Sequence, residues 1–443
     1  MRRVPGRFEI VARRRPVRLV APGFVQVHAE GPGTWAVPQP APYVAATAVG
    51  AGEVVLGAGD AELAVELAGD VISLRVTTAG RTTRHRSRRF GRLPHAPEEL
   101  GITVTGTWLT AFAREAGRWV ASARYDLRER LDVRDEAFCA DLHVSTTGGG
   151  AVEAGAFGQL GLRDVRLVTE VDGTPVRDGP RLLLTATHAG PGFFDTAHTG
   201  VWSLDPDEWR LEHRADLFFR RPEKPGVYGD NATHLVRDGA SDGAGWLVAT
   251  STWGDFSRAD KDAAVTTTIA RSDADLTRGR HVLDTRALRL PTTGLRSVGT
   301  WDPHLVRSGD SWLVAFVTAS RFFRFHPALA AGPDLDSLEL VAADPSRTAT
   351  EGPTLAKLDG EWRLLASDGR DGPRERRMTF PVFDLALEQV GTLDAPYPTN
   401  LPWPTIVETD SGWALVTFDG TRAGGDLVGY GTHGDVVVAT ASR

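Results

Sequence analysis

Residues 350–367 read TEGPTLAKLDGEWRLLAS, and this stretch decides the predicted fold. It consists of an apolar run, the turn dipeptide Asp359-Gly360 and a second apolar run that begins at Trp362. An Asp-Gly pair between two such runs is typical of an antiparallel β-hairpin. We therefore expect two paired strands here, with Trp362 at the start of the second strand.

The same order of strand, turn and strand occurs four more times after residue 150, at residues 165–187, 232–251, 303–318 and 404–418. Repeats of this size, built from successive antiparallel strands, are typical of β-propeller blades. Because one blade cannot bury both of its faces alone, five copies predict a closed ring of five blades. We expect the repeat tryptophans to pack between blades; they are Trp246, Trp312, Trp362 and Trp413.

The first 150 residues also indicate strands, but without the repeat. Residues 65–67 and 71–77 alternate apolar and polar side chains, which is typical of a sheet with one buried face. The glycine run at 148–150 indicates a boundary, because glycines do not easily hold a strand. The sequence therefore predicts an all-β protein, with a β-sandwich domain at residues 1–150 followed by a five-bladed β-propeller at residues 151–443.

Composition narrows the possible partners and location. The single cysteine, Cys139, excludes an internal disulfide; it lies in a run at 137–144 that we interpret as a strand, and we expect a buried structural thiol. The formal net charge of −7 gives no reason to expect nucleic acid or an anionic membrane as a partner. No apolar run approaches the ~18 residues of a membrane span, and no signal peptide is recognisable. We expect a cytoplasmic protein, and the oligomeric state stays open.

Acidic residues occur at or near the start of the first strand in four of the five copies. Because the innermost strands of a propeller run the same way along its axis, these acids should converge at one mouth of the channel. Clustered acids repel each other unless they share protons or bind a ligand, although acids that cap strand entrances are the alternative interpretation. The four acids are Asp164, Asp230, Asp302 and Glu351, and the last copy has Trp403 in their place.

Such a cluster fits the cleavage of a glycosidic bond. One carboxylic acid protonates the leaving oxygen, and a carboxylate activates water or attacks the sugar. A third acid nearby can keep the pKa of the proton donor high.

The propeller half resembles the family 43 glycoside hydrolases and their relatives in families 32, 62, 68, 117 and 130. The resemblance rests on residues 301–306, which read WDPHLV, and on residues 350–367. It implies that Glu351 is the general acid, Asp302 the modulator of its pKa and Asp164 the general base. This chain departs from the family in two ways: Asp164 is followed by valine where the family usually has proline, and the expected sandwich precedes the propeller. Asp230 is the alternative base.

Several further residues are expected to bind the sugar. His234 and His304 follow acids into the channel-lining strands, Trp301 precedes Asp302, and Phe193 follows the second strand of the first copy. Phe193 and its neighbour Phe194 are candidate sugar platforms, and Asp230 and Trp403 complete the predicted substrate-binding set. No cofactor is expected. The resemblance leaves room for a structural calcium or another ion on the axis, with His433 as its candidate ligand.

The expected function is that of a glycoside hydrolase, similar to arabinofuranosidases or xylosidases and inverting, whose partner is a carbohydrate substrate. One alternative is an inverting glycoside phosphorylase, for which Arg163, Arg321 and Arg324 could hold phosphate. A second alternative is a non-catalytic carbohydrate-binding propeller, and a third is a scaffold for protein interactions. The aligned acids favour an enzyme over the last two.

Overall fold

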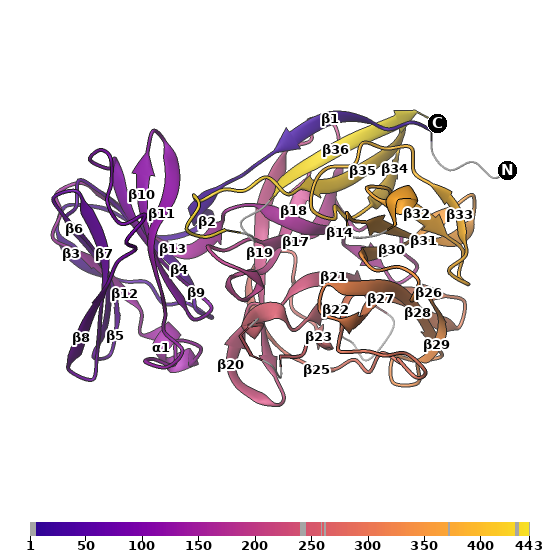
Figure 1. Ribbon diagram of the computed structural model, residues 1–443, viewed down its shortest axis with the longest axis horizontal. Coiled ribbons are helices and arrows are strands. Elements are labelled where there is room, and N and C mark those ends of the chain that lie inside the picture. Colours follow the sequence, from indigo (N-terminus) through magenta and orange to yellow (C-terminus); the bar gives the residue numbers. More distant parts are fainter. Residues whose placement is uncertain are drawn as a thin grey trace.

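The computed structural model describes residues 6–239, 245–257, 259–260, 263–370, 373–429 and 434–442. In this part of the chain, the strands form seven sheets, and helix is confined to a few short segments (Figure 1). The predicted all-β, propeller-type fold is confirmed. None of the helices in the described ranges has the length and apolar character needed to span a membrane.

Two sheets belong to the N-terminal region, at the left of Figure 1. In spatial order, one consists of β11 (Arg118–Asp126), β10 (Trp108–Glu115), β9 (Glu99–Thr105), β4 (Tyr43–Val49), β13 (Ala151–Gln159) and β2 (Arg18–Glu30). The other consists of β3 (Gly33–Ala36), β12 (His143–Thr146), β5 (Glu53–Ala58), β6 (Ala61–Ala68), β7 (Val71–Thr78) and β8 (Arg81–His85). Both sheets contribute to one buried apolar core, which includes Ile102 from β9 and Val65 from β6.

The residues around Cys139 differ from the prediction of a strand. Residues Glu136–Ala140 form the short helix α1, because the Asp135 carboxylate accepts a hydrogen bond from the Ala137 amide and caps the helix N-terminus. Cys139 is fully buried, and burial raises the pKa of its thiol to about 12. Its position agrees with the expected structural thiol.

The remaining five sheets form the propeller region. The first consists of β14 (Leu162–Leu167), β17 (Arg181–His188), β18 (His198–Leu204), β19 (Leu211–Arg221) and β20 (Lys224–Tyr228), with β16 (Arg177–Asp178) beside β17 and β24 (Gly279–Asp284) beside β19. The second consists of β15 (Thr169–Glu170), β21 (Asn231–Arg237), β22 (Trp246–Ser251), β23 (Thr267–Ser272) and β25 (Arg286–Ala287). Two single turns of 3₁₀ helix, η1 (Phe194–Thr196) and η2 (Trp253–Asp255), follow β17 and β22.

The last three sheets have four strands each. The third consists of β26 (Thr300–Ser308), β27 (Ser311–Arg321), β28 (Arg324–Gly332) and β29 (Glu339–Ala343). The fourth consists of β30 (Thr350–Leu358), β31 (Glu361–Asp368), β32 (Pro381–Phe383) and β33 (Gln389–Thr392), with the turn η3 (Arg374–Arg376) before β32. The fifth consists of β34 (Thr405–Thr409), β35 (Gly412–Asp419), β36 (Asp435–Ser442) and β1 (Glu9–Arg14).

Apolar cores between successive sheets hold this region together as a ring. Separate cores join the first sheet to the second, the second to the third, the third to the fourth and the fourth to the fifth. A further core joins the fifth sheet back to the first. The repeat tryptophans pack in or against these cores as expected, each at one interface: Trp246, Trp312, Trp362 and Trp413.

The N-terminal strand closes the ring. β1 pairs antiparallel with β36, so the fifth sheet takes its outer strand from the start of the chain; Figure 1 shows both at the top. The predicted boundary at residue 150 falls just before β13, which pairs with β2 and β4 of the N-terminal region. We therefore propose a domain boundary near Leu160, with β1 belonging to the ring.

Candidate active site

A β-bulge recurs at the same place in the first strand of four sheets. The ladder register breaks between Arg163 and Arg166, and at the matching places in β21, β26 and β30. The second residue of each bulge has a positive φ, close to 60°; these residues are Asp164, Ala232, Asp302 and Gly352. A bulge re-aims the side chains beside it, and backbone strain of this kind concentrates at functional sites. The bulges therefore define one structural position that is shared by four sheets.

Three of the four aligned acids come together through these bulges. Asp164 and Glu351 are partly exposed and line the same pocket, whereas Asp302 is buried. The Oδ2 atom of Asp302 accepts a hydrogen bond of 3.3 Å from the amide of Gly352, the residue after Glu351. Asp302 therefore lies next to the segment that carries Glu351, under the wall of the pocket.

The three acids share one electrostatic environment. Burial, and then the charges of Asp302 and Asp164, hold the pKa of Glu351 well above its usual range. Burial and the charge of Asp164 raise the pKa of Asp302 to about 8. Burial also raises the pKa of Asp164, but the adjacent Arg163 guanidinium, whose Nε lies 3.3 Å from Asp164 Oδ2, opposes that shift. Glu351 and Asp302 are thus biased towards holding protons, and Asp164 has a cation beside it.

The wall of the pocket is mostly aromatic. Only four of its lining residues carry polar side chains, namely Arg163, Asp164, Glu351 and Asn400. Phe323, at the turn between β27 and β28, is 48% exposed. Flat apolar rings around a few polar groups are the usual composition of a small-molecule site. The aromatic lining residues are Phe194, Trp253, Trp301, Phe322, Phe323, Phe325 and Phe418.

Trp301 and the phenylalanine pair lie at this pocket. Trp301 lines it, and its ring lies nearly parallel to that of Phe322, at a centroid distance of 6.3 Å. Phe194 also lines the pocket, whereas Phe193 packs against Phe194 with ring centroids 4.0 Å apart and is not a lining residue. Of the two candidate platforms, Phe194 is the one that a ligand in the pocket would meet.

The two predicted histidines lie on the axis and hold backbone groups. The His234 and His304 rings stack at 4.1 Å, and both are buried. His234 Nδ1 accepts a hydrogen bond from the Leu305 amide, and His304 Nδ1 accepts one from the Leu355 amide. Burial keeps the pKa of both rings well below its usual value, so they are neutral. Each ring therefore ties its own strand to the first strand of the next sheet.

Trp403 is fully buried beside the axis, not on the pocket surface. A Cβ on Gly352 would lie 2.2 Å from Cδ1 of Trp403, so the indole fills the space that a side chain at Gly352 would need. The Arg166 guanidinium covers the Trp403 ring at 4.4 Å. Trp403 is therefore a packing residue next to the acids.

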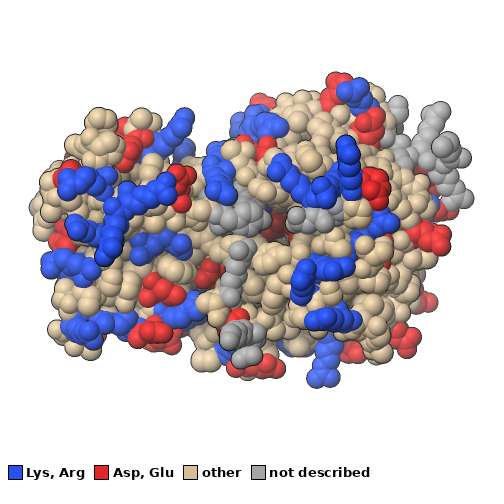
Figure 2. Space-filling model, in the orientation of Figure 1, with Lys and Arg blue, Asp and Glu red and all other residues tan. Residues whose placement is uncertain are grey.

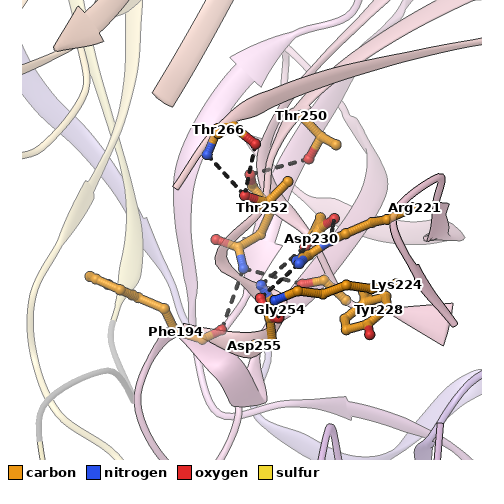
Figure 3. A network of polar contacts seen from close by, with 12 residues as sticks. Phe194, Arg221, Lys224, Tyr228, Asp230, Thr250, Thr252, Gly254, Asp255 and Thr266 are labelled. Atoms are coloured by element: carbon orange, nitrogen blue, oxygen red, sulfur yellow. Dashed lines mark hydrogen bonds and ion pairs between the residues drawn. The ribbon is translucent and has the colours of Figure 1, made fainter. Parts of the chain in front are cut away.

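Asp230 does not join the acid cluster, which corrects its alignment with the other three acids. It lies two residues before the bulge residue Ala232, whereas Asp164 and Asp302 occupy the bulge itself. As Figure 3 shows, its carboxylate faces Arg221, which binds both of its oxygens, and it accepts a hydrogen bond of 3.0 Å from the Gly254 amide. Arg221 also binds Asp255, which in turn binds Lys224. Asp230 thus anchors η2 and the β19–β20 hairpin.

Sequence reasoning missed two groups of residues at the site. The first is Arg166, whose alignment with His234 and His304 becomes visible only when the bulges are superposed. The second is the aromatic wall contributed by η2 and the β27–β28 hairpin. It was missed because the loops that follow the second strands show no repeat pattern. The available hint was the sequence FFRF at residues 322–325, in which three of four residues are aromatic.

A second cluster of metal-ligating side chain types lies in the first ring sheet. His188, His213 and Asp216 converge there, together with His198, whose Nε2 lies 3.3 Å from Asp216 Oδ1. The other carboxylate oxygen of Asp216 accepts a hydrogen bond of 3.1 Å from Arg280, which also binds Gln39 of the N-terminal region. With the Arg280 cation already on this carboxylate, we interpret the cluster as a proton-linked network at the interface of the two regions. The predicted axial ligand His433 lies outside the described residues.

Among the described residues, the charged side chains on the visible face are of mixed sign. Figure 2 shows basic and acidic residues interspersed over both the N-terminal region and the ring. Exposed charges of mixed sign are the ordinary surface of a protein with a small net charge.

Comparison with known proteins finds no family model and no curated sequence that match the chain. Among solved structures, an inulosucrase from Halalkalicoccus jeotgali bound to kestose aligns with a TM-score of 0.46 and 14% identity, over 64% of this chain and 85% of that chain. A family 43 glycoside hydrolase from Xanthomonas citri complexed with xylose aligns with a TM-score of 0.40 and 14% identity, over 63% of this chain and 87% of that chain.

A family 32 β-fructofuranosidase from Bombyx mori aligns with a TM-score of 0.42 and 14% identity, over 63% of this chain. The alignment spans only 59% of the length of that enzyme. The expected resemblance to families 32 and 43 is thus found, at the level of the fold.

Proposed function

We propose that this protein is a glycoside hydrolase whose general base is Asp164, whose general acid is Glu351 and whose pKa modulator is Asp302. The observation that carries the proposal is the meeting of these three acids on equivalent bulges, with unequal shifts of their pKa values. Pairs of carboxyl groups whose environments push their pKa values apart are typical of acid–base catalysis.

Glu351 and Asp302 together supply the proton. Asp302 and Glu351 interact, and burial raises the pKa of both, so the pair holds at least one proton at neutral pH. Glu351 lines the pocket, so that proton is within reach of the glycosidic oxygen of a bound substrate. Asp302 is covered by protein and acts on the substrate only through Glu351.

Asp164 is suited to the opposite role. Arg163 stabilises its ionised form, and the same carboxylate interacts with the Thr187 hydroxyl, which fixes its direction. An ionised, oriented carboxylate can remove a proton from a water molecule as that water attacks the anomeric carbon. Protonation of the leaving oxygen by Glu351 and attack by this water from the opposite face would give a product with inverted anomeric configuration.

The pocket supports a single sugar unit as the bound group. Aromatic faces such as those of Trp301 and Phe194 can stack against the apolar face of a sugar ring, and Asn400 can hydrogen-bond its hydroxyls. We propose a glycoside or oligosaccharide with a terminal pentose as the substrate, in keeping with the likeness to arabinofuranosidases and xylosidases.

The alternatives have weaker support. Phosphorolysis would need basic groups that hold phosphate, but the candidates Arg321 and Arg324 are exposed and do not line the pocket, while Arg163 is engaged with Asp164. A purely carbohydrate-binding propeller would need the aromatic wall but not three clustered acids that repel one another.

The test is the release of nitrophenol from a panel of nitrophenyl arabinofuranosides, xylosides, fructosides and galactosides, with and without added phosphate. Hydrolysis of one of them in the absence of phosphate supports the proposal. Turnover only with phosphate would identify a phosphorylase. Binding of the glycosides without turnover under either condition would identify a binding protein.

A further inference from the structure

One guanidinium group spans the ring axis next to the acids. Arg166 is fully buried on β14, two residues after the bulge residue Asp164. Its Nη2 donates a hydrogen bond of 2.9 Å to the carbonyl oxygen of Asp302, and its Nη1 donates one of 2.9 Å to the carbonyl oxygen of Pro353. These carbonyls belong to the strands that carry Asp302 and Glu351.

The same side chain reaches two further groups. Nη1 lies 3.4 Å from the Thr354 hydroxyl, and the guanidinium plane covers the Trp403 indole at 4.4 Å. Arg166 thus joins its own sheet to the third and fourth sheets. It also contacts Trp403, which lies two residues before the first strand of the fifth sheet. Converging carbonyl and hydroxyl oxygens are the ligands that a hard metal cation would bind. Here these oxygens bind the planar guanidinium group of Arg166 instead.

Arg166 is charged, whereas the residues at the equivalent position in the first strands of the next two sheets are neutral. The matching positions in the next two sheets carry His234 and His304, which accept backbone hydrogen bonds as neutral rings. Fixing adjacent first strands therefore needs no charge at this position. Burying a cation costs free energy unless nearby charges or hydrogen bonds compensate it. We therefore infer that the charge of Arg166 acts on the neighbouring acids.

The electrostatic relation between Arg166 and the acids is mutual. Burial lowers the pKa of Arg166 to about 10, and the charges of Asp302 and Asp164 oppose that shift. In return, Arg166 lowers the pKa of both carboxyl groups against the effect of burial. Both the geometry and the charge of Arg166 thus act on the residues proposed to be catalytic.

We propose that Arg166 is a built-in axial cation and a positioning residue for the acid cluster. It holds the two strands that carry Asp302 and Glu351 by their carbonyl oxygens, and its charge, together with that of Arg163, favours the ionised form of Asp164. The expected effect on the pH profile of activity rests on the proposed glycosidase function, whereas the expected effect on the pH dependence of stability does not.

The test compares Arg166→Met, Arg166→Lys and a neutral control, Thr405→Val. The Thr405 hydroxyl donates a buried hydrogen bond of 2.6 Å to the Val165 carbonyl oxygen, so its loss also weakens the contact between two sheets, but without removing a charge. For each variant, the pH profile of kcat/KM and the pH dependence of the melting temperature are measured. Calcium and EDTA are added to wild type in parallel.

Arg166→Met should move the acidic limb of the kcat/KM profile to higher pH, because the positive charge of Arg166 lowers the pKa of Asp164. Arg166→Lys should keep the wild-type acidic limb and lose activity at higher pH, because a buried lysine gives up its proton more readily than an arginine. Thr405→Val should lower the melting temperature and leave the profile unmoved, and wild type should respond to neither calcium nor EDTA.

The melting temperatures test the inference without a substrate. Without the cation, the folded-state pKa of Asp164 rises further above its unfolded value of about 3.9, so the folded variant binds more protons than folded wild type between that value and the raised pKa. The stability deficit of Arg166→Met should therefore widen as pH rises through this window. If Arg166→Met does not fold, the lysine variant still decides, because a buried lysine has a folded-state pKa below its unfolded value, so its stability deficit should narrow as pH rises through the folded-state pKa.

A uniform loss of stability and activity in both arginine variants, with no movement of either pH dependence, would overturn the inference and leave Arg166 as a packing residue. Activity that depends on calcium would also overturn it. If wild type hydrolyses no glycoside, the proposed function fails, and the melting curves still decide the role of Arg166.

Discussion

The amide of Gly352 donates a hydrogen bond of 3.3 Å to Oδ2 of Asp302, which joins the bulge of the fourth sheet to that of the third. The contact thereby ties Asp302 to the residue that follows Glu351 in β30. The charge of Asp302 in turn raises the pKa of Glu351. This contact makes the two acids one titrating unit, and several measurable consequences follow from it.

Replacing Asp302 should change the pH range of activity. In Asp302→Asn, the charge that raises the pKa of Glu351 is gone, so Glu351 should lose its proton at lower pH and the alkaline limb of the kcat/KM profile should move down. The profile is measured on whichever nitrophenyl glycoside proves to be a substrate. An unmoved alkaline limb, with activity lost evenly at all pH values, would show that Asp302 does not modulate Glu351.

Replacing Glu351 should stabilise the protein at alkaline pH. The folded-state pKa of Glu351 lies above its unfolded value, so its contribution to stability is fully present below the unfolded value and is lost as pH rises through the folded value. Glu351→Gln removes this loss, so its melting temperature should rise relative to that of wild type as pH increases above the unfolded pKa of about 4.3. A constant difference between pH 4 and pH 9 would contradict the raised pKa.

Asp164 and Asp230 should give opposite phenotypes. Asp164→Asn removes the proposed base from a partly exposed position, so kcat should fall by roughly 10²–10⁴-fold, with little loss of stability. Asp230→Asn weakens a buried ion pair with Arg221 and should destabilise the fold by roughly 3–5 kcal/mol, while the folded fraction keeps its pH profile. Denaturant unfolding and steady-state kinetics on both variants check this. The reverse pattern would make Asp230 the base.

Gly352 should tolerate no side chain, for two separable reasons. Its φ of 65° disfavours other residues, and a Cβ would collide with the Trp403 indole. Gly360 has a φ of 78° with nothing within 4 Å of its Cβ position, so Gly360→Ala measures the cost of the backbone alone, about 1–2 kcal/mol. Gly352→Ala should destabilise by clearly more than this in urea unfolding. Equal losses would show that Trp403 does not pack as described.

The repeat pattern made the ring predictable, because Trp362 and its counterparts mark an interface between sheets wherever they occur. The acids were partly predictable: Asp302 and Glu351 follow recognisable motifs. Asp230 was misplaced because a bulge adds a residue to a strand, and sequence alone did not show where that residue lies. Arg166 was missed for the same reason, and α1 because a five-residue helix has no periodicity to read.

The central claim is that Glu351 donates a proton to the leaving group, and leaving-group dependence tests it most directly. The measurement is kcat/KM on a dinitrophenyl glycoside and on the matching alkyl glycoside, for wild type, Glu351→Gln and the control Glu388→Gln. The Glu388 side chain is exposed in the turn between β32 and β33. We expect Glu351→Gln to lose roughly 10²–10⁴-fold on the alkyl glycoside and far less on the dinitrophenyl glycoside, whose leaving group needs no proton. Equal losses on both substrates, or full activity on the alkyl glycoside, would contradict the assignment.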